Sequence, residues 1–277
     1  MLEIPETITI ANQLNTTIQG KIIKEVIVNA SPHKFAFFHK DPKAYPDLLI
    51  GIKVGEATGI GASVEIEAET MRITFGDGTN LRYYSKISEV PPKHQFLLGF
   101  DDGSALAVTI QMYGFIAVFK EGENQNPYYL VSKTKPLPIS EDFNFDYFLK
   151  LIQDTPSKLS VKALLATEQR IPGLGNGVLQ DILFDAKLSP RTKISVLSDD
   201  DVRQLYRSIR KILTEMIEKG GRDTEKDLYG QEGGYPTVMS SKHLGEPCPI
   251  CGSPIVKEAY MGGSVYTCPH CQPKEKA

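Results

Sequence analysis

The chain opens with apolar positions at helical spacing. The repeat consists of Ile8, Ala11, Leu14 and Ile18, and it stops at Gly20. Pro5 and Glu6 precede it, and both residue types favour the first turn of a helix. The pattern predicts a helix over residues 5–19.

From about residue 21 to 135 the pattern changes to short alternating runs. Turn pairs such as Asp77-Gly78 and Asp102-Gly103 separate several of them, which is typical of hairpins. We therefore expect an antiparallel sheet domain, most simply a β-sandwich. The runs are Lys24–Val28, Ser63–Ala68, Met71–Phe75, Leu81–Tyr84, Phe96–Phe100, Ala105–Ile110 and Phe115–Phe119.

A proline-rich stretch, Lys135–Ile139, marks a linker, and beyond it the period is helical. We expect helices over 140–152 (capped by Ser140), 159–170, 175–187 and from Ser198 to Gly220. The last has one apolar stripe, interpreted as core packing.

All four cysteines lie in the last thirty residues, in two Cys-x2-Cys pairs with sixteen residues between them. Two such pairs can place four thiolates around one tetrahedral metal ion, and the intervening segment suffices for a short hairpin. Two disulfides or a redox pair are the alternatives, but no secretion signal or βαβ pattern accompanies them. The pattern predicts a structural zinc ribbon with ligands Cys248, Cys251, Cys268 and Cys271.

Net charge is −3, which gives nucleic-acid binding no support by itself. Residues 1–150 carry 14 basic and 18 acidic side chains, and residues 151–277 carry 17 and 16, so a basic surface on the second half remains possible. No run of about 18 apolar residues occurs, which excludes a membrane-spanning helix. The first residues resemble no signal peptide, so we expect a cytoplasmic protein.

The loop Ile171–Gly177, of sequence IPGLGNG, separates two predicted helices. Asn176 is expected in the first turn of the second helix, where free backbone amides and the helix dipole can hold a phosphate. The alternatives are an ordinary Pro-Gly turn and an Asn176 side chain that only caps its own helix.

The order of these parts resembles the formamidopyrimidine-DNA glycosylase/endonuclease VIII family. The resemblance runs from residue 1 to about 273 and is densest over Leu164–Pro190 and Gly220–Gln272. It implies a helix–two-turn–helix element and a zinc ribbon that grip the DNA backbone around a flipped-out nucleotide. It also implies excision of an oxidised base followed by strand cleavage (AP lyase activity).

The family's nucleophile is the amine of an N-terminal proline, which forms an imine with the damaged nucleotide. Glu3 and Glu6 match the family's two acidic positions, but Leu2 stands where the proline would be. Because initiator Met is normally removed only before small side chains, we expect Met1 to stay, which displaces the amine. Glu3 and Glu6 are candidate proton-transfer groups, with a helix-dipole role as the alternative.

Other family positions also differ. Gly263 replaces the arginine of the zinc hairpin, and roughly Gly61 replaces a hairpin lysine. Asp77, Gln111 and Tyr113 stand where the family fills the hole left by the flipped base with Met, Arg and Phe. Only an aromatic wedge is retained, so the sequence predicts altered chemistry.

Tyr113 is a candidate for stacking on an unpaired base, or else it faces inward on a sheet. Arg222 and Lys226 lie in the segment that corresponds to the family's lesion-reading loop, and they are candidate DNA contacts. A solvated charged loop is the alternative, because Asp223, Glu225 and Asp227 alternate with them.

The sequence thus predicts an α+β protein in three parts: an N-terminal helix with a β-sandwich (1–134), a helix–two-turn–helix domain (135–240) and a zinc ribbon (241–277). Its expected function is binding of damaged or abasic double-stranded DNA in base excision repair, as a cytoplasmic, nucleoid-associated monomer with weak, altered or lost catalysis. The alternatives are an active glycosylase/AP lyase using a terminal amine or a Glu-activated water, and an interaction or RNA-associated module.

Overall fold

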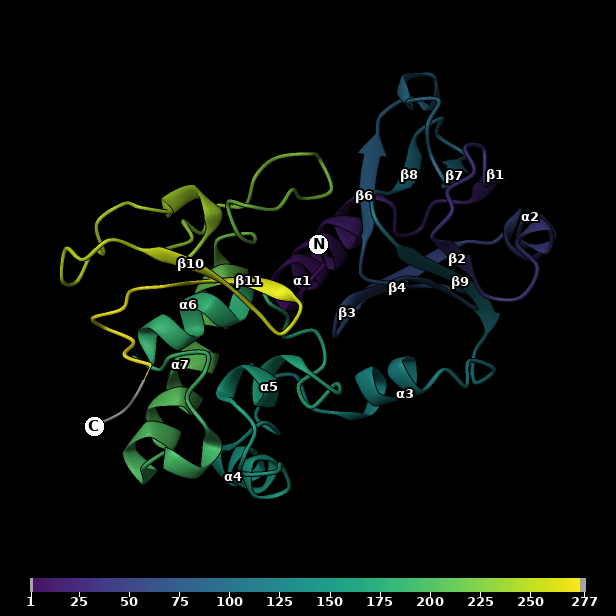
Figure 1. The fold of residues 1–277 in the computed structure, drawn as a ribbon. Helices are drawn as coiled ribbons and strands as arrows, with labels where there is room; N and C mark the ends of the chain where they lie inside the picture. Colours follow the sequence, from purple (N-terminus) through teal and green to yellow (C-terminus); the bar gives the residue numbers. More distant parts are fainter. Residues whose placement is uncertain (1, 275–277) are drawn as a thin grey trace. The chain divides into compact units, whose positions relative to one another are not determined.

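The structure is a computed structural model that describes residues 2–274. The chain forms two compact units (Figure 1). The first comprises Met1–Lys133 and Lys219–Gly234, and the second comprises Thr134–Glu218 and Tyr235–Ala277.

The first unit begins with helix α1 (Ile4–Thr17), as its apolar spacing predicts. Glu3 and Glu6 form a reciprocal capping box at its N-terminus, and Pro5 lies in the first turn. This arrangement satisfies backbone amides that the first turn would otherwise leave unpaired. The side chains of Ile10 and Leu14 are buried.

Two sheets follow, with strand orders β1-β7-β8-β6 and β2-β9-β5-β4-β3. Neighbouring strands are antiparallel except β2 and β9, which are parallel. Four strands have the bounds that alternation predicts: β4 (Ser63–Ala68), β5 (Met71–Phe75), β7 (Phe96–Phe100) and β8 (Ala105–Ile110). The others are β1 (Ile23–Val28), β2 (Ala36–Phe38), β3 (Val54–Ile60), β6 (Thr79–Tyr84) and β9 (Gly114–Lys120).

The two sheets share one core, which is the predicted β-sandwich. Phe75 and Val64 from the five-stranded sheet and Phe96 and Leu106 from the four-stranded sheet belong to the same buried cluster. Three short helices lie between strands: η1 (Pro42–Ala44), α2 (Tyr45–Leu49) and η2 (Ile87–Glu89). Helix α3 (Pro127–Thr134) follows β9.

Residues 219–234 differ from the predicted domain division, which assigned them to the helical part. They return to the first unit, where Leu228 is fully buried in the sandwich core. The backbone amide of Tyr83 donates to the carbonyl of Leu228 at 3.0 Å. The ends of this segment also meet, since Gly233 N donates to Arg222 O at 3.1 Å.

The second unit contains α4 (Phe145–Gln153), α5 (Val161–Ala166), α6 (Val178–Asp185) and α7 (Asp199–Glu218). Ser140 does not cap the first of these; the Asn144 side chain accepts from the Tyr147 amide instead. Hairpin β10 (Val256–Tyr260) and β11 (Gly263–Thr267) lies between the cysteine pairs, as predicted. Two short 3-10 helices, η3 (Ile194–Val196) and η4 (Ser241–His243), complete the unit. None of the helices in residues 2–274 is long and apolar enough to cross a membrane.

Candidate metal centre and nucleic-acid interface

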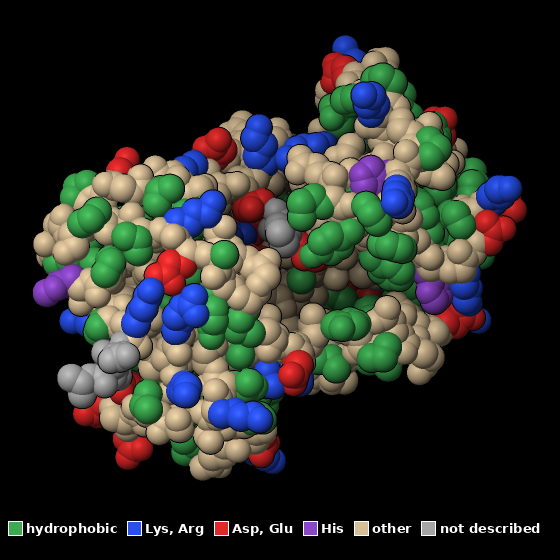
Figure 2. Space-filling view, in the orientation of Figure 1, with side chains coloured by type: hydrophobic (Ala, Val, Ile, Leu, Met, Phe, Trp, Pro, Cys, Tyr) green, Lys and Arg blue, Asp and Glu red, His purple; other side chains and the backbone are tan. Residues whose placement is uncertain are grey.

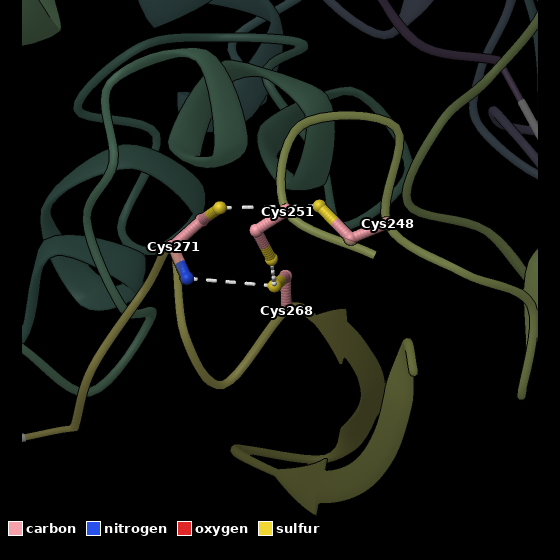
Figure 3. A group of neighbouring side chains, drawn as sticks. All are labelled: Cys248, Cys251, Cys268 and Cys271. Carbon is pink, nitrogen blue, oxygen red and sulfur yellow. Dashed lines mark hydrogen bonds between the residues drawn. The ribbon is translucent and has the colours of Figure 1, made fainter. Parts of the chain in front are cut away.

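The four cysteines converge in the second unit (Figure 3). Their sulfur atoms lie within 4.8 Å of one another, with Cys251–Cys268 at 3.4 Å and Cys248–Cys271 at 3.9 Å. Sulfurs bonded tetrahedrally to zinc at about 2.3 Å are separated by about 3.8 Å. No disulfide forms among them, so the geometry fits a structural four-cysteine zinc site.

The ribbon is anchored on helix α6. Phe184 packs in one small core with Cys248 and Cys268. Gln180 Oε1 accepts from the Tyr266 amide at 2.5 Å, and Gln272 Nε2 donates to Leu188 O at 2.9 Å. The metal site therefore fixes the hairpin against the helix that follows the IPGLGNG loop.

Asn176 lies against this hairpin. Its Nδ2 donates to Ser264 O at 2.9 Å, and its Oδ1 accepts from Lys162 Nζ at 2.7 Å. A Cβ atom on Gly263 would lie 3.3 Å from the Asn176 side chain, so a residue without a side chain lets the hairpin approach closely. Asn176 precedes α6, which starts at Val178, rather than standing in its first turn. The predicted phosphate ligand is thus positioned by the ribbon.

Lys162 flanks the helical motif and joins these elements. Its Nζ donates to Asn176 Oδ1 and to Tyr260 O at 2.8 Å, and the residue is 3% exposed. Within the described part of the chain no acidic side chain pairs with it, and burial lowers the pKa of Lys162. A buried cation without a counter-ion is costly, so this position favours an anionic ligand.

In the first unit, Arg222 joins the two candidate catalytic glutamates. Its Nε lies 3.0 Å from Glu6 Oε1 and its Nη2 2.8 Å from Glu6 Oε2, while Nη1 lies 3.6 Å from Glu3 Oε2. All three residues are at most 5% exposed. Burial disfavours the charged guanidinium, but the two carboxylates outweigh it and raise the pKa of Arg222. Arg222 is therefore bound to Glu6 and shielded from solvent, which does not support the predicted contact with DNA in this conformation.

Leu2, which the sequence comparison above predicts at the family's proline position, is buried in the sandwich core. The side chain thus serves as an apolar anchor for the start of the chain. The amine of Met1, the remaining candidate nucleophile, lies outside the described residues.

Asp77, Gln111 and Tyr113 come together on two adjoining turns. The Tyr113 hydroxyl donates to Asp77 Oδ2 at 3.3 Å, and burial raises the pKa of Asp77. The two turns lie so close that only glycine fits at position 78, where a Cβ would overlap the Tyr113 carbonyl oxygen at 1.7 Å. Tyr113 is exposed, so its side chain does not face inward on the sheet.

A cavity of about 290 Å³ adjoins these turns and is lined by Gly78, Asn80, Gln111, Met112, Tyr113, Thr224 and Glu225. No lysine or arginine lines it, and Tyr113 forms an aromatic wall. The size and chemistry suit a small neutral heterocycle better than a phosphate.

The other predicted positions are separate from this cavity. Lys226 is exposed in the 219–234 segment, where it pairs with Glu232 in an isolated β-bridge. Gly61 lies in the tight turn between β3 and β4 with φ of +59°, and its carbonyl accepts from Thr7 Oγ1 at 3.0 Å. The turn thus packs on α1 and presents no cation.

Comparisons with known proteins agree with this architecture. Residues 135–227 match the formamidopyrimidine-DNA glycosylase H2TH domain. A formamidopyrimidine-DNA glycosylase of Thermus thermophilus is 26% identical over 98% of both chains, and that of Legionella pneumophila strain Philadelphia 1 is 28% identical over 99% of both.

Solved structures share the fold over nearly the whole chain. The crystal structure of MutM (Fpg) from Thermus thermophilus is similar with a TM-score of 0.82 at 24% identity, covering 99% of this chain and 100% of that one. The Lactococcus lactis Fpg in complex with abasic-site DNA gives 0.83 at 23% identity, over 98% and 100%. Residues 135–227 thus match the H2TH domain of formamidopyrimidine-DNA glycosylases, and over nearly its full length the chain is similar to proteins of the Fpg/MutM family in sequence and in fold.

Proposed function

We propose that this protein binds damaged or abasic double-stranded DNA in base excision repair, and that its glycosylase and AP-lyase chemistry is weak, altered or lost. The observation that carries the proposal is the buried contact of Arg222 with both Glu3 and Glu6. These glutamates match the family's acidic positions, so a fixed cation already occupies the acidic groups on which the chemistry depends.

The DNA-binding half of the proposal is supported by the second unit. Asn176, the uncompensated Lys162 and the zinc-fixed hairpin gather hydrogen-bonding groups and one buried positive charge at one place. Phosphate contacts of this kind position a protein on DNA without reading its sequence. The L. lactis relative was crystallised with abasic-site DNA, which is the ligand class that we carry over.

The altered chemistry is supported by several positions together. Leu2 is buried at the proline position, and neither Gly61 nor Gly263 supplies the cation that the family uses on the phosphates. An amine displaced by even about 1 Å can lose on the order of a hundredfold in rate. Because the nucleophile and the cationic side chains that contact the phosphates are lost together, we infer that the protein recognises damaged DNA rather than turning it over.

For recognition, we assign Asn176 to the DNA backbone, Tyr113 to stacking on an unpaired base, and Lys226 to an outer phosphate. The four cysteines hold zinc for structural purposes only. The cavity beside Tyr113 would receive a base, since its lining lacks cations.

Borohydride reduction in the presence of abasic-site duplex tests this function. We expect specific binding, no covalent adduct and no strand cleavage. A trapped adduct would show an imine and establish a working amine, contrary to the proposal.

A second candidate is hydrolysis of the glycosidic bond by water, with Glu3 as general base. It is favoured by the position of Glu3, whose Oε2 lies 3.6 Å from the Arg222 guanidinium and is therefore held less closely than Glu6, at 2.8 Å. Release of an oxidised base without any trapped adduct, abolished by Glu3→Gln, would identify this route.

A further inference from the structure

Next to Tyr113, the five-stranded sheet carries three aromatic side chains that the proposed site does not use, Phe35, Phe37 and Phe115. Strand β2 pairs in parallel with β9, and Phe37 lies opposite Phe115 in the register. Phe35 directly precedes β2, and its carbonyl accepts from the amide of Gly114 at 3.0 Å, which places it beside Tyr113. We call Phe35, Phe37, Tyr113 and Phe115 the aromatic strip.

The strip faces away from the core. Ala36 and Phe38 pack against the sandwich core and Ile116 is fully buried, whereas Phe35 is 46% exposed and Phe37 is 53% exposed. Figure 2 shows hydrophobic side chains gathered over the part of this unit that contains β2 and β9, with histidine and lysine beside them. Adjoining aromatic side chains that are exposed together generally mark an interaction surface.

Charge around the strip favours a polyanion. Residues 26–40 and 103–120 contain no Asp or Glu, although the chain as a whole has a net charge of −3. Lys40 is neutralised by Glu123 at 2.8 Å, but the Lys34 ammonium lies 5.3 Å from the centre of the Phe35 ring and makes no ion pair among residues 2–274. Asp77 is the nearby carboxylate, and it accepts the Tyr113 hydroxyl.

The spacing also suits nucleobases. Neighbouring strands are about 4.8 Å apart, and alternate residues of one strand about 6.6 Å apart. Successive bases rise about 3.4 Å in a duplex and can spread further when they are unpaired. Rings at these intervals can each stack on one base of a short unpaired stretch, as sheet-borne aromatic side chains do in other nucleic-acid-binding folds.

We propose that the aromatic strip, with Lys34, binds two or three unpaired nucleotides next to the lesion, so that the protein prefers damage within locally melted DNA. The inference rests on the proposed function for the location of the lesion at Tyr113. It extends that function by naming the DNA structure that is recognised.

Fluorescence anisotropy with two labelled DNAs tests the inference. One is a fully paired duplex with an abasic site, and the other has the same site inside a bubble of four unpaired nucleotides on each strand. The variant is Phe35→Ala/Phe37→Ala, which removes exposed rings, and the control is Tyr128→Ala, which removes a 66% exposed ring on α3. Circular dichroism checks that each variant is folded.

We expect wild type to bind the bubble more tightly than the paired duplex. The double variant should lose at least about fivefold on the bubble, from stacking of one base, and little on the paired duplex. The control should match wild type on both DNAs. Unchanged bubble binding by the double variant would overturn the inference, and so would an equal loss in the Tyr128→Ala control.

The failures of the two proposals are distinguishable. If the paired abasic duplex is ignored while the bubble binds through the strip, the lesion function fails and the strip inference stands. If the protein binds the paired abasic duplex but the double variant binds the bubble as tightly as wild type does, only the inference fails. The oligomeric state is a further readout. If the wild-type protein self-associates as its concentration rises and the double variant does not, the strip is a self-association surface and the inference is overturned.

Discussion

Arg222 and Glu6 form a two-point ion pair inside the first unit, although 216 residues separate them in sequence. Nε and Nη2 of the arginine each face one oxygen of the carboxylate, at 3.0 and 2.8 Å. The backbone amide of Arg222 also donates to Glu6 at 3.3 Å. The pair ties the 219–234 segment to the first turn of α1.

Replacing Arg222 by methionine should destabilise the first unit strongly, since it leaves two buried carboxylates without their cation. Breaking such a pair from one side costs about 3–5 kcal/mol. Urea denaturation measures the change in the free energy of unfolding. The matched control is Lys226→Met on the same segment, an exposed position where we expect a change within about 0.5 kcal/mol. A cost below about 1 kcal/mol for Arg222→Met would show that the pair does not hold the segment.

Cys268→Ser should remove zinc and loosen the ribbon. Ligand loss at a structural zinc site removes binding energy that contributes directly to folding. Metal analysis of the purified protein is expected to fall from one zinc per chain toward none, with faster proteolysis after about residue 240. Ile250→Ala, an exposed position between the first two cysteines, serves as the control that keeps its metal. Full zinc content in Cys268→Ser would refute the four-cysteine site.

Asn176→Ala should weaken binding to abasic duplexes of every sequence by about tenfold, because a hydrogen bond to a charged phosphate is lost. Its salt dependence should stay unchanged, since no charge is removed. Lys162→Met should instead reduce the slope of log affinity against log salt by about 1. Gln125→Ala, an exposed amide in the first unit, is the control. A sequence-dependent loss in Asn176→Ala would contradict the backbone assignment.

Tyr45 gives the sandwich a specific alkaline sensitivity. Its side chain is fully buried, its hydroxyl donates to His39 O at 2.6 Å, and burial raises the pKa of Tyr45 to about 12. Because the pKa is higher in the folded state, the neutral phenol stabilises the fold below about pH 10, and this stabilisation is lost as the pH rises toward 12.

Tyr45→Phe should therefore be less stable than wild type at neutral pH, by an amount that shrinks between pH 10 and 12. Thermal unfolding across this range measures the difference. Tyr128→Phe, at a well exposed position, should show a constant small difference. A constant difference for Tyr45→Phe as well would contradict the buried-phenol explanation.

Local patterns predicted much of the fold. Short alternating runs predicted strands β4, β5, β7 and β8 correctly. Asp-Gly turns follow β5 and separate β7 from β8, so the turn chemistry agrees with the side-chain period there. The short strand β2 carries too few residues to show a period, and its parallel pairing with β9 depends on the folded chain. The helix expected from Ser140 starts five residues later, since Asn144 is the residue whose side chain reaches an amide of the first turn.

The site was less accessible to sequence reasoning, because its defining contacts are long-range. Arg222 looked like part of a solvated loop of alternating charges, and nothing local indicates that Glu3 and Glu6 would surround it. Nothing local in the sequence distinguishes Lys162 from a surface lysine. Its role depends on its hydrogen bonds to Asn176 and to Tyr260 of the ribbon hairpin. The hairpin lies about 100 residues away in sequence and is held in place by the zinc cysteines.

The most direct test of the account is the affinity of the purified protein for an abasic-site duplex relative to the same duplex undamaged, at low ionic strength. We predict tighter binding to the abasic duplex by at least about tenfold, or 1.4 kcal/mol, with affinity falling steeply as salt increases. Equal affinity for the two duplexes, or no binding to either, would contradict the proposal that this protein recognises damaged DNA.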